Sequence, residues 1–346
     1  MKALVYAGEG LVRLEDRPRP QVLEPTDVIL RVTAAAICGT DLHLVEGKVP
    51  GFEEGTVLGH EFVGVVEDAG DAVRTVEPGK RYVASMQTAC GACRACSRHD
   101  YRNCPSNAFF GMGYAFGNLD GGQAEYVRVP LADMTLAEIP DDVPDEVAVL
   151  VSDILPTAYT AMLRGGVRPG DTVAVVGCGP VGQLSVMCAR LLGASQVFAV
   201  DMVAERLREA EALGAVPVDA GRVDPSDYVA ERTGFLGADV VVEAVGNQSA
   251  LNTAWSLGRT GAVIALVGLL TEEEWPIGCG DSWLKVLDVR PVIGDSVTHR
   301  WDLLRLIRSG RLNPGQIISH VLRLDDAVDA YQMFQNRTAT KIILTP

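Results

Sequence analysis

The stretch Asp171–Asp201, DTVAVVGCGPVGQLSVMCARLLGASQVFAVD, contains a complete strand–turn–helix–strand pattern. "DTVAVVG" (171–177) is an apolar, β-branched run typical of a buried strand, and "VFAVD" (197–201) is a second one. Between them, "PVGQLSVMCARLLGA" (180–194) has its apolar residues at helical spacing. Strands that alternate with helices form a parallel sheet with helices on both faces. The stretch therefore predicts a doubly wound α/β domain.

Three glycines lie between the first of these strands and the helix, in the pattern GxGxxG. The first glycine permits a tight turn, the second lets the backbone approach a pyrophosphate, and the third lets the helix pack closely on the strand. The start of the helix adds free N–H groups and a partial positive charge. We therefore predict that a dinucleotide contacts the residues of this loop: Gly177, Gly179, Pro180, Val181 and Gly182.

Asp201 ends the second strand, 24 residues after Gly177. This is near the expected offset for a carboxylate that binds the adenosine ribose hydroxyls of the cofactor. A carboxylate there would repel a 2′-phosphate, so the predicted cofactor is NAD rather than NADP, although Arg206 could shift that balance. Cys178 and Cys188 are predicted to be small packing residues and not reactive thiols.

The rest of the chain indicates a second domain into which the doubly wound domain is inserted. Residues 1–155 contain short alternating runs such as "DVILRVTAAAIC" (27–38) and "HEFVGVVEDAG" (60–70), punctuated by Gly and Pro, which predict a β-rich domain. Residues 156–292 carry the repeated strand–helix pattern. Residues 293–346 contain one helix-like segment and a final strand, and we expect them to return to the first domain.

Composition excludes several classes of function. The formal net charge is -15 and no Lys/Arg-rich run offsets it, so the phosphate backbone of a nucleic acid would be repelled. The opening MKALVYAGEG has too short an apolar run for a signal peptide, and no later run reaches the roughly 18 residues that a membrane helix needs. We expect a cytoplasmic protein that binds neither nucleic acid nor membrane.

Half of the eight cysteines lie within fifteen residues, at spacing C-x2-C-x2-C-x7-C. In a reducing compartment, clustered cysteines are more often metal ligands than disulfides. Four thiolates complete the tetrahedral shell of one zinc and leave no open position for substrate, so this zinc would be structural. An iron–sulfur cluster or a redox centre is the alternative. The predicted structural ligands are Cys90, Cys93, Cys96 and Cys104.

A second group of metal-ligating residues is spread along the chain. Cys38, and His60 followed by Glu61, offer a thiolate, an imidazole and a carboxylate. A catalytic zinc needs about three protein ligands and one exchangeable position, so the third ligand could be Glu61 or a residue further along. Asp153 precedes a Pro-containing turn that leads into the second domain, and by spacing alone it is equally a ligand or a helix cap.

Several motifs together resemble the zinc-dependent medium-chain alcohol dehydrogenases over essentially the full length. They are "CGTDLH", "GHEFVGVV", the four-cysteine lobe, "SDILPTAYTA", "GCGPVG" followed by Asp201, and "IALVG". The resemblance implies a GroES-like β-rich catalytic domain, an inserted Rossmann domain with a doubly wound parallel sheet, and a zinc in the cleft between them. It also implies a structural zinc in the four-cysteine lobe, and so two Zn2+ ions per chain.

The resemblance assigns roles to residues around the catalytic zinc. Cys38 and His60 match two of its ligands, and Asp153 occupies the position where a secondary-alcohol-type subgroup has its third ligand. Glu61 matches a neighbour that can approach the zinc. Thr40 matches the hydroxyl that receives the alcohol proton.

The resemblance assigns three further positions. His43 matches the histidine that passes the proton to solvent, although an isolated histidine at this distance from a cysteine would ordinarily have no role. Lys341 falls where the family commonly has a basic residue near the cofactor pyrophosphate. Val267 lies where backbone groups meet the nicotinamide carboxamide.

The implied activity is hydride transfer between NAD and a secondary alcohol or ketone through a zinc-bound alkoxide. We expect an apolar substrate pocket lined by Met86, Phe109, Phe110 and Leu269, which favours an apolar small-molecule alcohol over a polyol. A polyol, threonine-like or aldehyde dehydrogenase is the alternative. A non-catalytic or zinc-free relative is remote, because such relatives lack the ligands that this chain has.

The resemblance also implies a homo-oligomer, a tetramer or a dimer. Dimers of this family join their Rossmann sheets edge to edge, and "AVIALVGL" (262–269) is the predicted edge strand.

Overall fold

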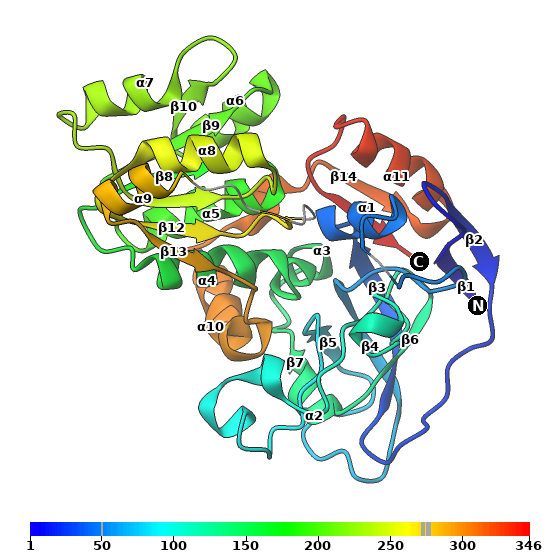
Figure 1. The fold of residues 1–346 in the computed structure, drawn as a ribbon. Helices are drawn as coiled ribbons and strands as arrows, with labels where there is room; N and C mark the ends of the chain where they lie inside the picture. The colour runs from blue at the N-terminus through cyan, green and yellow to red at the C-terminus, as the bar shows by residue number, and fades with distance from the viewer. Residues whose placement is uncertain (50, 271–273, 275–277) are drawn as a thin grey trace. The chain divides into compact units, whose positions relative to one another are not determined.

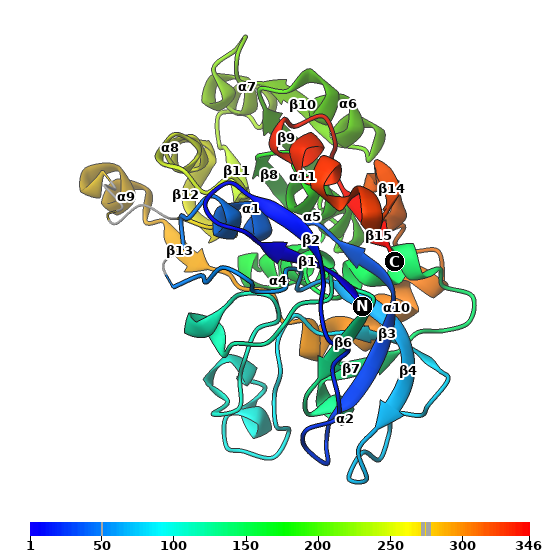
Figure 2. The same ribbon diagram turned by 90° about the vertical axis from the view of Figure 1, so that its right-hand side faces the viewer.

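The computed structural model describes all residues except 50, 271–273 and 275–277. It divides into two compact units (Figures 1 and 2). Unit 1 contains Met1–Asp153 and Asp295–Pro346, and unit 2 contains Ile154–Gly294. The predicted boundaries at 155/156 and 292/293 lie two residues from these divisions. The second unit is thus an insertion in the first.

Unit 2 is built on a six-stranded parallel sheet with the order β10-β9-β8-β11-β12-β13. The direction of winding reverses next to β8, and ligands of doubly wound folds bind at that point, outside the carboxyl ends of the strands. The strands are β8 (Thr172–Val176), β9 (Gln196–Asp201), β10 (Val216–Asp219), β11 (Ala238–Glu243), β12 (Gly258–Leu266) and β13 (Asp288–Pro291).

Helices cover both faces of this sheet (Figure 1). Successive strand residues point to opposite faces. Val241 belongs to a buried cluster with residues of α7 (Pro225–Arg232) and α8 (Gln248–Leu257). Val240, its neighbour, packs instead against Gly165 at the end of α4 (Ile154–Gly165). The remaining helices of unit 2 are α5 (Pro180–Leu191), α6 (Ala204–Ala212) and α9 (Cys279–Lys285).

Unit 1 contains a seven-stranded sheet, with the order β14-β15-β3-β4-β5-β7 and with β6 paired to β3, and a separate β1–β2 pair. The long β3 is the centre of this sheet, and β15, from the far end of the chain, pairs with its C-terminal part. The strands are β1 (Lys2–Tyr6), β2 (Val12–Asp16), β3 (Val28–Ala36), β4 (Phe62–Ala69), β5 (Arg81–Ala84), β6 (Tyr126–Val129), β7 (Leu136–Glu138), β14 (His320–Arg323) and β15 (Ile342–Thr345).

Short helices decorate unit 1, and two of the longer ones come from the returning segment. The helices are α1 (Gly39–Val45), α2 (Ala132–Thr135), α3 (Asp145–Ala148), α10 (Ser296–Arg308) and α11 (Ala327–Gln335), with 3-10 turns η1 (Cys96–Arg98), η2 (Tyr101–Asn103), η3 (Tyr114–Phe116), η4 (Val149–Val151), η5 (Pro314–Ile317) and η6 (Leu324–Asp326). The expected return of the chain to the first domain therefore occurs through β14, β15, α10 and α11.

One expectation about the Rossmann sheet is wrong. The strand in "AVIALVGL" is β12, which has neighbours on both sides, and β13 is the outermost strand. Strand β13 pairs in parallel with β12. It is short and has little apolar content, so its sequence shows no recognisable strand pattern.

No single helix among the described residues is long and apolar enough to cross a membrane; only the bent pair Asp145–Val151 and Ile154–Gly165 passes that test when joined.

Candidate active site

Two antiparallel strands bring the first candidate ligands together. Ala35 of β3 pairs with Phe62 of β4, so the end of β3 lies beside the start of β4. Cys38 follows β3 and begins α1, whereas His60 directly precedes β4. Residues 22 positions apart in the sequence therefore lie side by side. Asp153, the last residue of the first segment of unit 1, joins them from 115 positions beyond Cys38.

The four side chains form a compact group suited to a metal ion. The ligand atoms of Cys38, His60, Glu61 and Asp153 all lie within 4.8 Å of one another. Asp153 Oδ2 is 3.8 Å from Cys38 Sγ and 3.3 Å from His60 Nε2. Sulfur, nitrogen and oxygen ligands of one tetrahedral zinc would be about 3.3 to 3.7 Å apart, given the usual bond lengths.

The burial of this group supports the same conclusion. His60 and Glu61 are fully buried, and neither His60 Nε2, which lies near Asp153 Oδ2, nor Glu61 Oε1 makes a hydrogen bond of good geometry. A buried imidazole nitrogen without a partner is costly, and coordination to a metal removes that cost. Burial raises the pKa of the Cys38 thiol, so a metal would have to displace its proton on binding.

The Asp41 carboxylate contacts two of the candidate ligands, His60 and Cys38. Its Oδ1 lies 3.2 Å from His60 Nδ1, and its Oδ2 accepts from the backbone N–H of Cys38 at 3.0 Å. Burial lowers the pKa of His60, but the neighbouring groups, the Asp41 carboxylate first among them, outweigh it and the pKa is raised overall. The sequence analysis did not identify Asp41, although an acidic residue three positions after a helix N-cap is a recognisable capping-box signal.

Lys341 is not where it was predicted to act. The expectation that it contacts the cofactor pyrophosphate is wrong in this structure, because its side chain is fully buried in unit 1. Its Nζ donates to Glu61 Oε2 at 2.5 Å and to the carbonyl of Ile37 at 2.9 Å. Burial lowers the pKa of Lys341, but the Glu61 carboxylate raises it above its usual value, so Lys341 remains a cation beside the ligand group.

Thr40 and His43 lie three residues apart on α1, and therefore on one face of that helix. Both are half-buried, and His43 Nδ1 is buried without a hydrogen-bond partner. Burial, and then the nearby Lys48, lower the pKa of His43 below 6.5. At neutral pH the imidazole is therefore uncharged and can accept a proton.

The four cysteines Cys90, Cys93, Cys96 and Cys104 form a second group of potential ligands, with all four sulfurs within 4.8 Å of one another. Cys90 Sγ and Cys96 Sγ are 3.9 Å apart, and none of the four is in a disulfide. Sulfurs bound to one tetrahedral zinc would be about 3.8 Å apart, whereas a disulfide needs about 2.05 Å. Backbone N–H groups of Cys90 and Cys96 also donate to sulfurs of the group, as suits bound thiolates.

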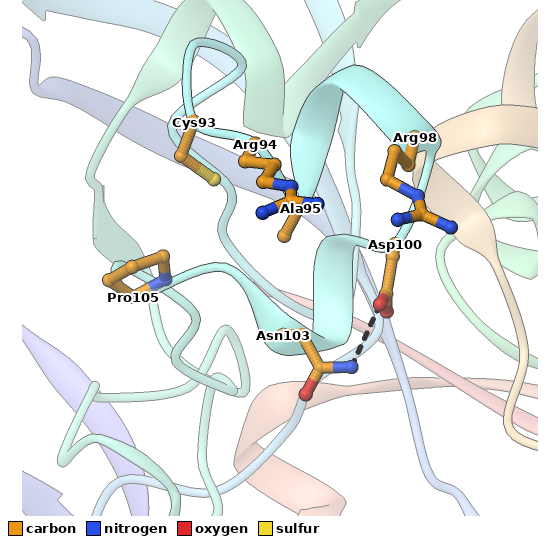
Figure 3. A pocket seen from close by; sticks show the side chains of 7 residues that line it. All are labelled: Cys93, Arg94, Ala95, Arg98, Asp100, Asn103 and Pro105. Carbon is orange, nitrogen blue, oxygen red and sulfur yellow. Dashed lines mark hydrogen bonds between the residues drawn. The ribbon is translucent and has the colours of Figure 1, made fainter.

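A hollow on the surface of the four-cysteine lobe is lined by Cys93, Arg94, Ala95, Arg98, Asp100, Asn103 and Pro105 (Figure 3). The guanidinium groups of Arg94 and Arg98 share it with Asp100, which accepts a hydrogen bond from Asn103 Nδ2 at 2.8 Å (Figure 3). None of Cys38, His60 and Asp153 lines this hollow, so it is not the predicted substrate pocket.

The glycine-rich loop of unit 2 has the geometry that its sequence predicts. A β-carbon on Gly182 would lie 1.9 Å from the carbonyl oxygen of Gly177, and Gly177 itself has φ of +91°. No described heavy atom lies within 4 Å of where a β-carbon of Gly179 would stand. That open space is a cradle for a phosphate at the start of α5, where Pro180 is the first helical residue. The loop fits a dinucleotide.

Asp201 is hydrogen-bonded to the backbone of this loop. Its Oδ2 accepts from the N–H of Cys178 at 2.7 Å, and its Oδ1 accepts from those of Met202 and Val203. These bonds fix a carboxylate at the end of β9. Burial and Asp201 raise the pKa of Cys178, which agrees with a packing role for this thiol.

Glu243 is a buried residue of unit 2 that the sequence analysis missed. Its Oε1 accepts from the N–H groups of Val245 and Gly246, both at 2.8 Å. Its main-chain oxygen accepts from the N–H of Val267 at 2.8 Å. Glu243 thus holds together the turns after β11 and β12, including Val267. An acidic residue that ends the apolar run "ADVVVE" was the available signal.

The predicted substrate pocket needs a correction. Phe110 is fully buried in the core of unit 1, where its ring packs edge-on against Phe62 at 5.0 Å, so it does not line an open pocket. Met86 is also buried. Phe109 is half-buried against Phe116, and Leu269 is 40% exposed in unit 2. An aromatic run that forms core looks the same in sequence as one that lines a pocket.

Comparison with known proteins agrees with this geometry. The family model described as "Alcohol dehydrogenase GroES-like domain" matches residues 24–141, and the one described as "Zinc-binding dehydrogenase" matches residues 180–309. The chain is 33% identical over 379 residues to the zinc-type alcohol dehydrogenase-like protein AdhB of Bacillus subtilis, covering 100% of both. It is 39% identical to the structure of alcohol dehydrogenase TADH from Thermus sp. ATN1, with a TM-score of 0.95 over 100% of this chain and 99% of that one.

Two further relatives bear on cofactor and substrate. A zinc-binding dehydrogenase from Sinorhizobium meliloti, solved bound to NADP, is 29% identical with a TM-score of 0.87, over 100% of this chain and 99% of that one. The glutathione-independent formaldehyde dehydrogenase of Pseudomonas aeruginosa is 32% identical over 391 residues, covering 100% of this chain and 97% of the relative.

Proposed function

The chain belongs to the zinc-dependent medium-chain alcohol dehydrogenases, and from that premise we propose that it oxidises a secondary alcohol with NAD, or reduces the ketone, at a zinc held by Cys38, His60 and Asp153. The observation that carries this proposal is the buried group of four ligating side chains in unit 1. When bound, zinc supplies Lewis-acid activation of the substrate oxygen and the nicotinamide exchanges the hydride.

The ligand set leaves one position for the substrate. A thiolate, an imidazole and a carboxylate supply three ligands, and a catalytic zinc keeps its fourth position open. Glu61 Oε2 accepts from Lys341 Nζ, while its Oε1 has no hydrogen-bond partner and Glu61 belongs to the same group of potential ligands. If zinc is bound by Cys38, His60 and Asp153, Glu61 would be a neighbouring carboxylate available as a fourth protein ligand.

Thr40 and His43 carry the proton in this proposal. The Thr40 hydroxyl, two residues after Cys38, can accept the proton that an alcohol gives up. His43 is uncharged at neutral pH and has an unpartnered Nδ1, so it is a suitable acceptor further along the path.

The four-cysteine lobe is proposed to hold a second, structural zinc. Its ligand sphere is complete with four sulfurs, so it leaves no place for a substrate. We therefore propose two zinc ions per chain, one in each group.

NAD is the proposed cofactor, and the Asp201 carboxylate supports it. A 2′-phosphate at the end of β9 would meet that negative charge, whereas ribose hydroxyls can donate to it. Arg206 is close enough to affect the pKa of Cys178 in the loop, so a cation is also present. Exchanging Asp201→Ala should lower kcat/KM with NAD about tenfold and raise it with NADP; if the ratio of the two does not change, Asp201 does not set the preference.

An aldehyde is the second candidate substrate. The formaldehyde dehydrogenase relative matches this chain over its full length. Because Phe110 and Met86 are buried, they do not support a broad apolar pocket. An aldehyde is therefore the substrate class to be compared with a secondary alcohol.

A homo-oligomer, a tetramer or a dimer, is also proposed. The strand β13 is the outermost described strand of its sheet, and exposed apolar side chains precede it: Trp283 is 80% and Val286 68% exposed. Mass measured in solution by light scattering tests this.

Reduced-cofactor absorbance tests the function directly. Secondary alcohols, primary alcohols, polyols, threonine and formaldehyde would be compared with NAD and NADP, before and after chelation and zinc return. Turnover of secondary alcohols with NAD that is lost on chelation and restored by zinc supports the proposal. Activity confined to formaldehyde favours the second candidate, and activity that survives complete zinc removal overturns the zinc mechanism.

A further inference from the structure

The carboxylate of Asp41 has a second support, which extends the ligand group deep into unit 1. Besides the N–H of Cys38, Asp41 Oδ2 accepts from Gln123 Nε2 at 3.1 Å. Gln123 Oε1 in turn accepts from the hydroxyl of Tyr331 at 2.8 Å. Tyr331 belongs to α11, 208 residues further along the chain. A path of hydrogen bonds therefore connects the returning C-terminal segment to Asp41, and the other oxygen of Asp41 lies in contact with His60 Nδ1 at 3.2 Å.

The amide of Gln123 has all its principal partners. Its Nε2 also donates to the carbonyl of Ala36 at 3.1 Å, so both amide hydrogens are used and the oxygen receives a hydroxyl. This pattern determines which side of the amide is nitrogen, because the Ala36 carbonyl and the Asp41 carboxylate can only accept hydrogen bonds, whereas the Tyr331 hydroxyl can donate to the oxygen. Gln123, Asp41 and Tyr331 are all at most 2% exposed. A break in the path would leave buried polar groups unpaired.

The backbone fixes Gln123 relative to the ligand. The N–H of Gln123 donates to the carbonyl of Leu58 at 2.9 Å, and the N–H of Gly122 donates to that of Gly59 at 2.8 Å. A β-carbon on Gly59 would lie 2.5 Å from Gln123 Cγ, so the glycine just before His60 makes this close approach possible. Gln123 and His60 are thus held by the same pair of adjacent segments.

We propose that Gln123 and Tyr331 are positioning residues that hold the Asp41 carboxylate, and through it the ring of His60, in the orientation needed to retain zinc at the Cys38–His60–Asp153 group. A histidine ligand is oriented by the partner of its other ring nitrogen, and loss of such outer partners typically weakens metal binding about 10- to 100-fold. Gln123 limits rotation of the Asp41 carboxylate because it holds the oxygen that does not face His60. Tyr331 does the same for the amide.

This inference rests on the proposed zinc site, and the test separates the two. Gln123→Met removes the donor at nearly constant volume, and Tyr331→Phe removes only a hydroxyl. Tyr82→Phe is the matched control, because Tyr82 is 2% exposed in the same unit and its hydroxyl bonds to the N–H of Glu77 instead. His60→Ala, which lacks the proposed site, identifies the release that belongs to the four-cysteine lobe.

The measurement is zinc release into a chelating indicator, with total zinc by mass spectrometry and thermal unfolding of each zinc-loaded protein. We expect zinc to leave the Cys38 group about tenfold faster in Gln123→Met and a few-fold faster in Tyr331→Phe, with release from the lobe unchanged. Tyr82→Phe should release zinc as the parent protein does.

Two outcomes would overturn the inference. Release from the Cys38 group at the parent rate in Tyr331→Phe and Gln123→Met, with a fall in thermal stability alone, would make the path a packing feature. Should Gln123→Met fail to fold, an unchanged release rate in Tyr331→Phe suffices to reject it. A parent protein whose zinc content equals that of His60→Ala would instead overturn the zinc site itself.

Discussion

The two candidate metal groups of unit 1 are assembled in different ways. The four-cysteine lobe takes all its ligands from fifteen consecutive residues, Cys90–Cys104. The Cys38 group takes its ligands from positions as far apart as 38 and 153, and its supporting groups extend to Tyr331 and Lys341. A local loop can order its own ligands around an ion, whereas the dispersed group must be built by the sheet. Zinc bound in the lobe should therefore stabilise the fold, whereas the Cys38 group depends on a fold that is already stable.

Loss of the lobe should give the largest effect. In Cys104→Ser, the complete sulfur shell is broken, and because a structural zinc contributes folding free energy directly, we expect the free energy of unfolding to fall by about 4 kcal/mol or more. Denaturant unfolding with zinc analysis measures it. The contrast between the groups fails if this variant loses one zinc but unfolds at the parent midpoint.

Loss of a ligand of the Cys38 group should instead reduce activity and leave the fold intact. His60→Ala should lower kcat/KM by at least about 10³-fold, or about 4 kcal/mol of transition-state stabilisation, because the substrate oxygen loses its activating ion. The loss of zinc should be one ion per chain, with the fold intact by circular dichroism. Activity within tenfold of the parent would contradict the assignment of His60.

The Lys341–Glu61 pair tests the same comparison, because it places two buried charges in the dispersed group and each charge is destabilising without the other. Lys341→Met leaves the Glu61 carboxylate buried without its cation, and we expect a loss of about 3 kcal/mol of stability. Adding Glu61→Gln should restore part of it. Lys80→Met, which breaks exposed pairs, is the control and should change little.

The same pair has a pH signature. The pKa of Lys341 is raised in the folded protein above 10.5, so on the alkaline side the contribution of the pair is present up to that pH and is lost as pH rises through the folded value. Burial raises the pKa of Glu61, so the charge pair is also lost at acidic pH. Unfolding measured across alkaline pH should show a steeper loss in the parent than in Lys341→Met. Parallel pH profiles would show that the pair is not ionised.

His43 should give the smallest effect. His43→Ala should slow alcohol oxidation about tenfold at pH 7, because a positioned proton acceptor is lost. In the parent, burial lowers the pKa of His43 below its ordinary value, so its contribution should be lost on acidification at a lower pH than for an ordinary histidine. Measured kcat against pH tests both points; identical profiles for the two proteins would remove His43 from the proton path.

The parts of the molecule that sequence predicted well are those in which neighbours in the chain are neighbours in space. The alternation of strands and helices gave the doubly wound sheet, and GxGxxG gave a loop whose glycines are sterically required. The spacing of the four cysteines gave a group of sulfurs at metal-binding separation. Covalent connection limits how far such residues can separate, so their pattern carries the geometry.

Residues far apart in sequence were less well predicted. By spacing alone Asp153 is equally a helix cap or a ligand, and only the family resemblance favours a ligand; in the structure its carboxylate lies 3.3 Å from His60 Nε2. Phe110 was assigned to a pocket and lies in the core, and β12 was assigned to an edge that β13 occupies. Spacing cannot distinguish these alternatives, because each depends on what packs against the residue.

The sequence by itself determined the two-domain plan, the dinucleotide loop, the four-cysteine lobe and, through family resemblance, the type of chemistry. Only the tertiary structure decided that Lys341 neutralises Glu61 and that Gln123 and Tyr331 stand behind Asp41. The reason is physical: a buried charge or amide must find its partner wherever the fold provides one, and those partners lie 82 to 280 residues away in the chain.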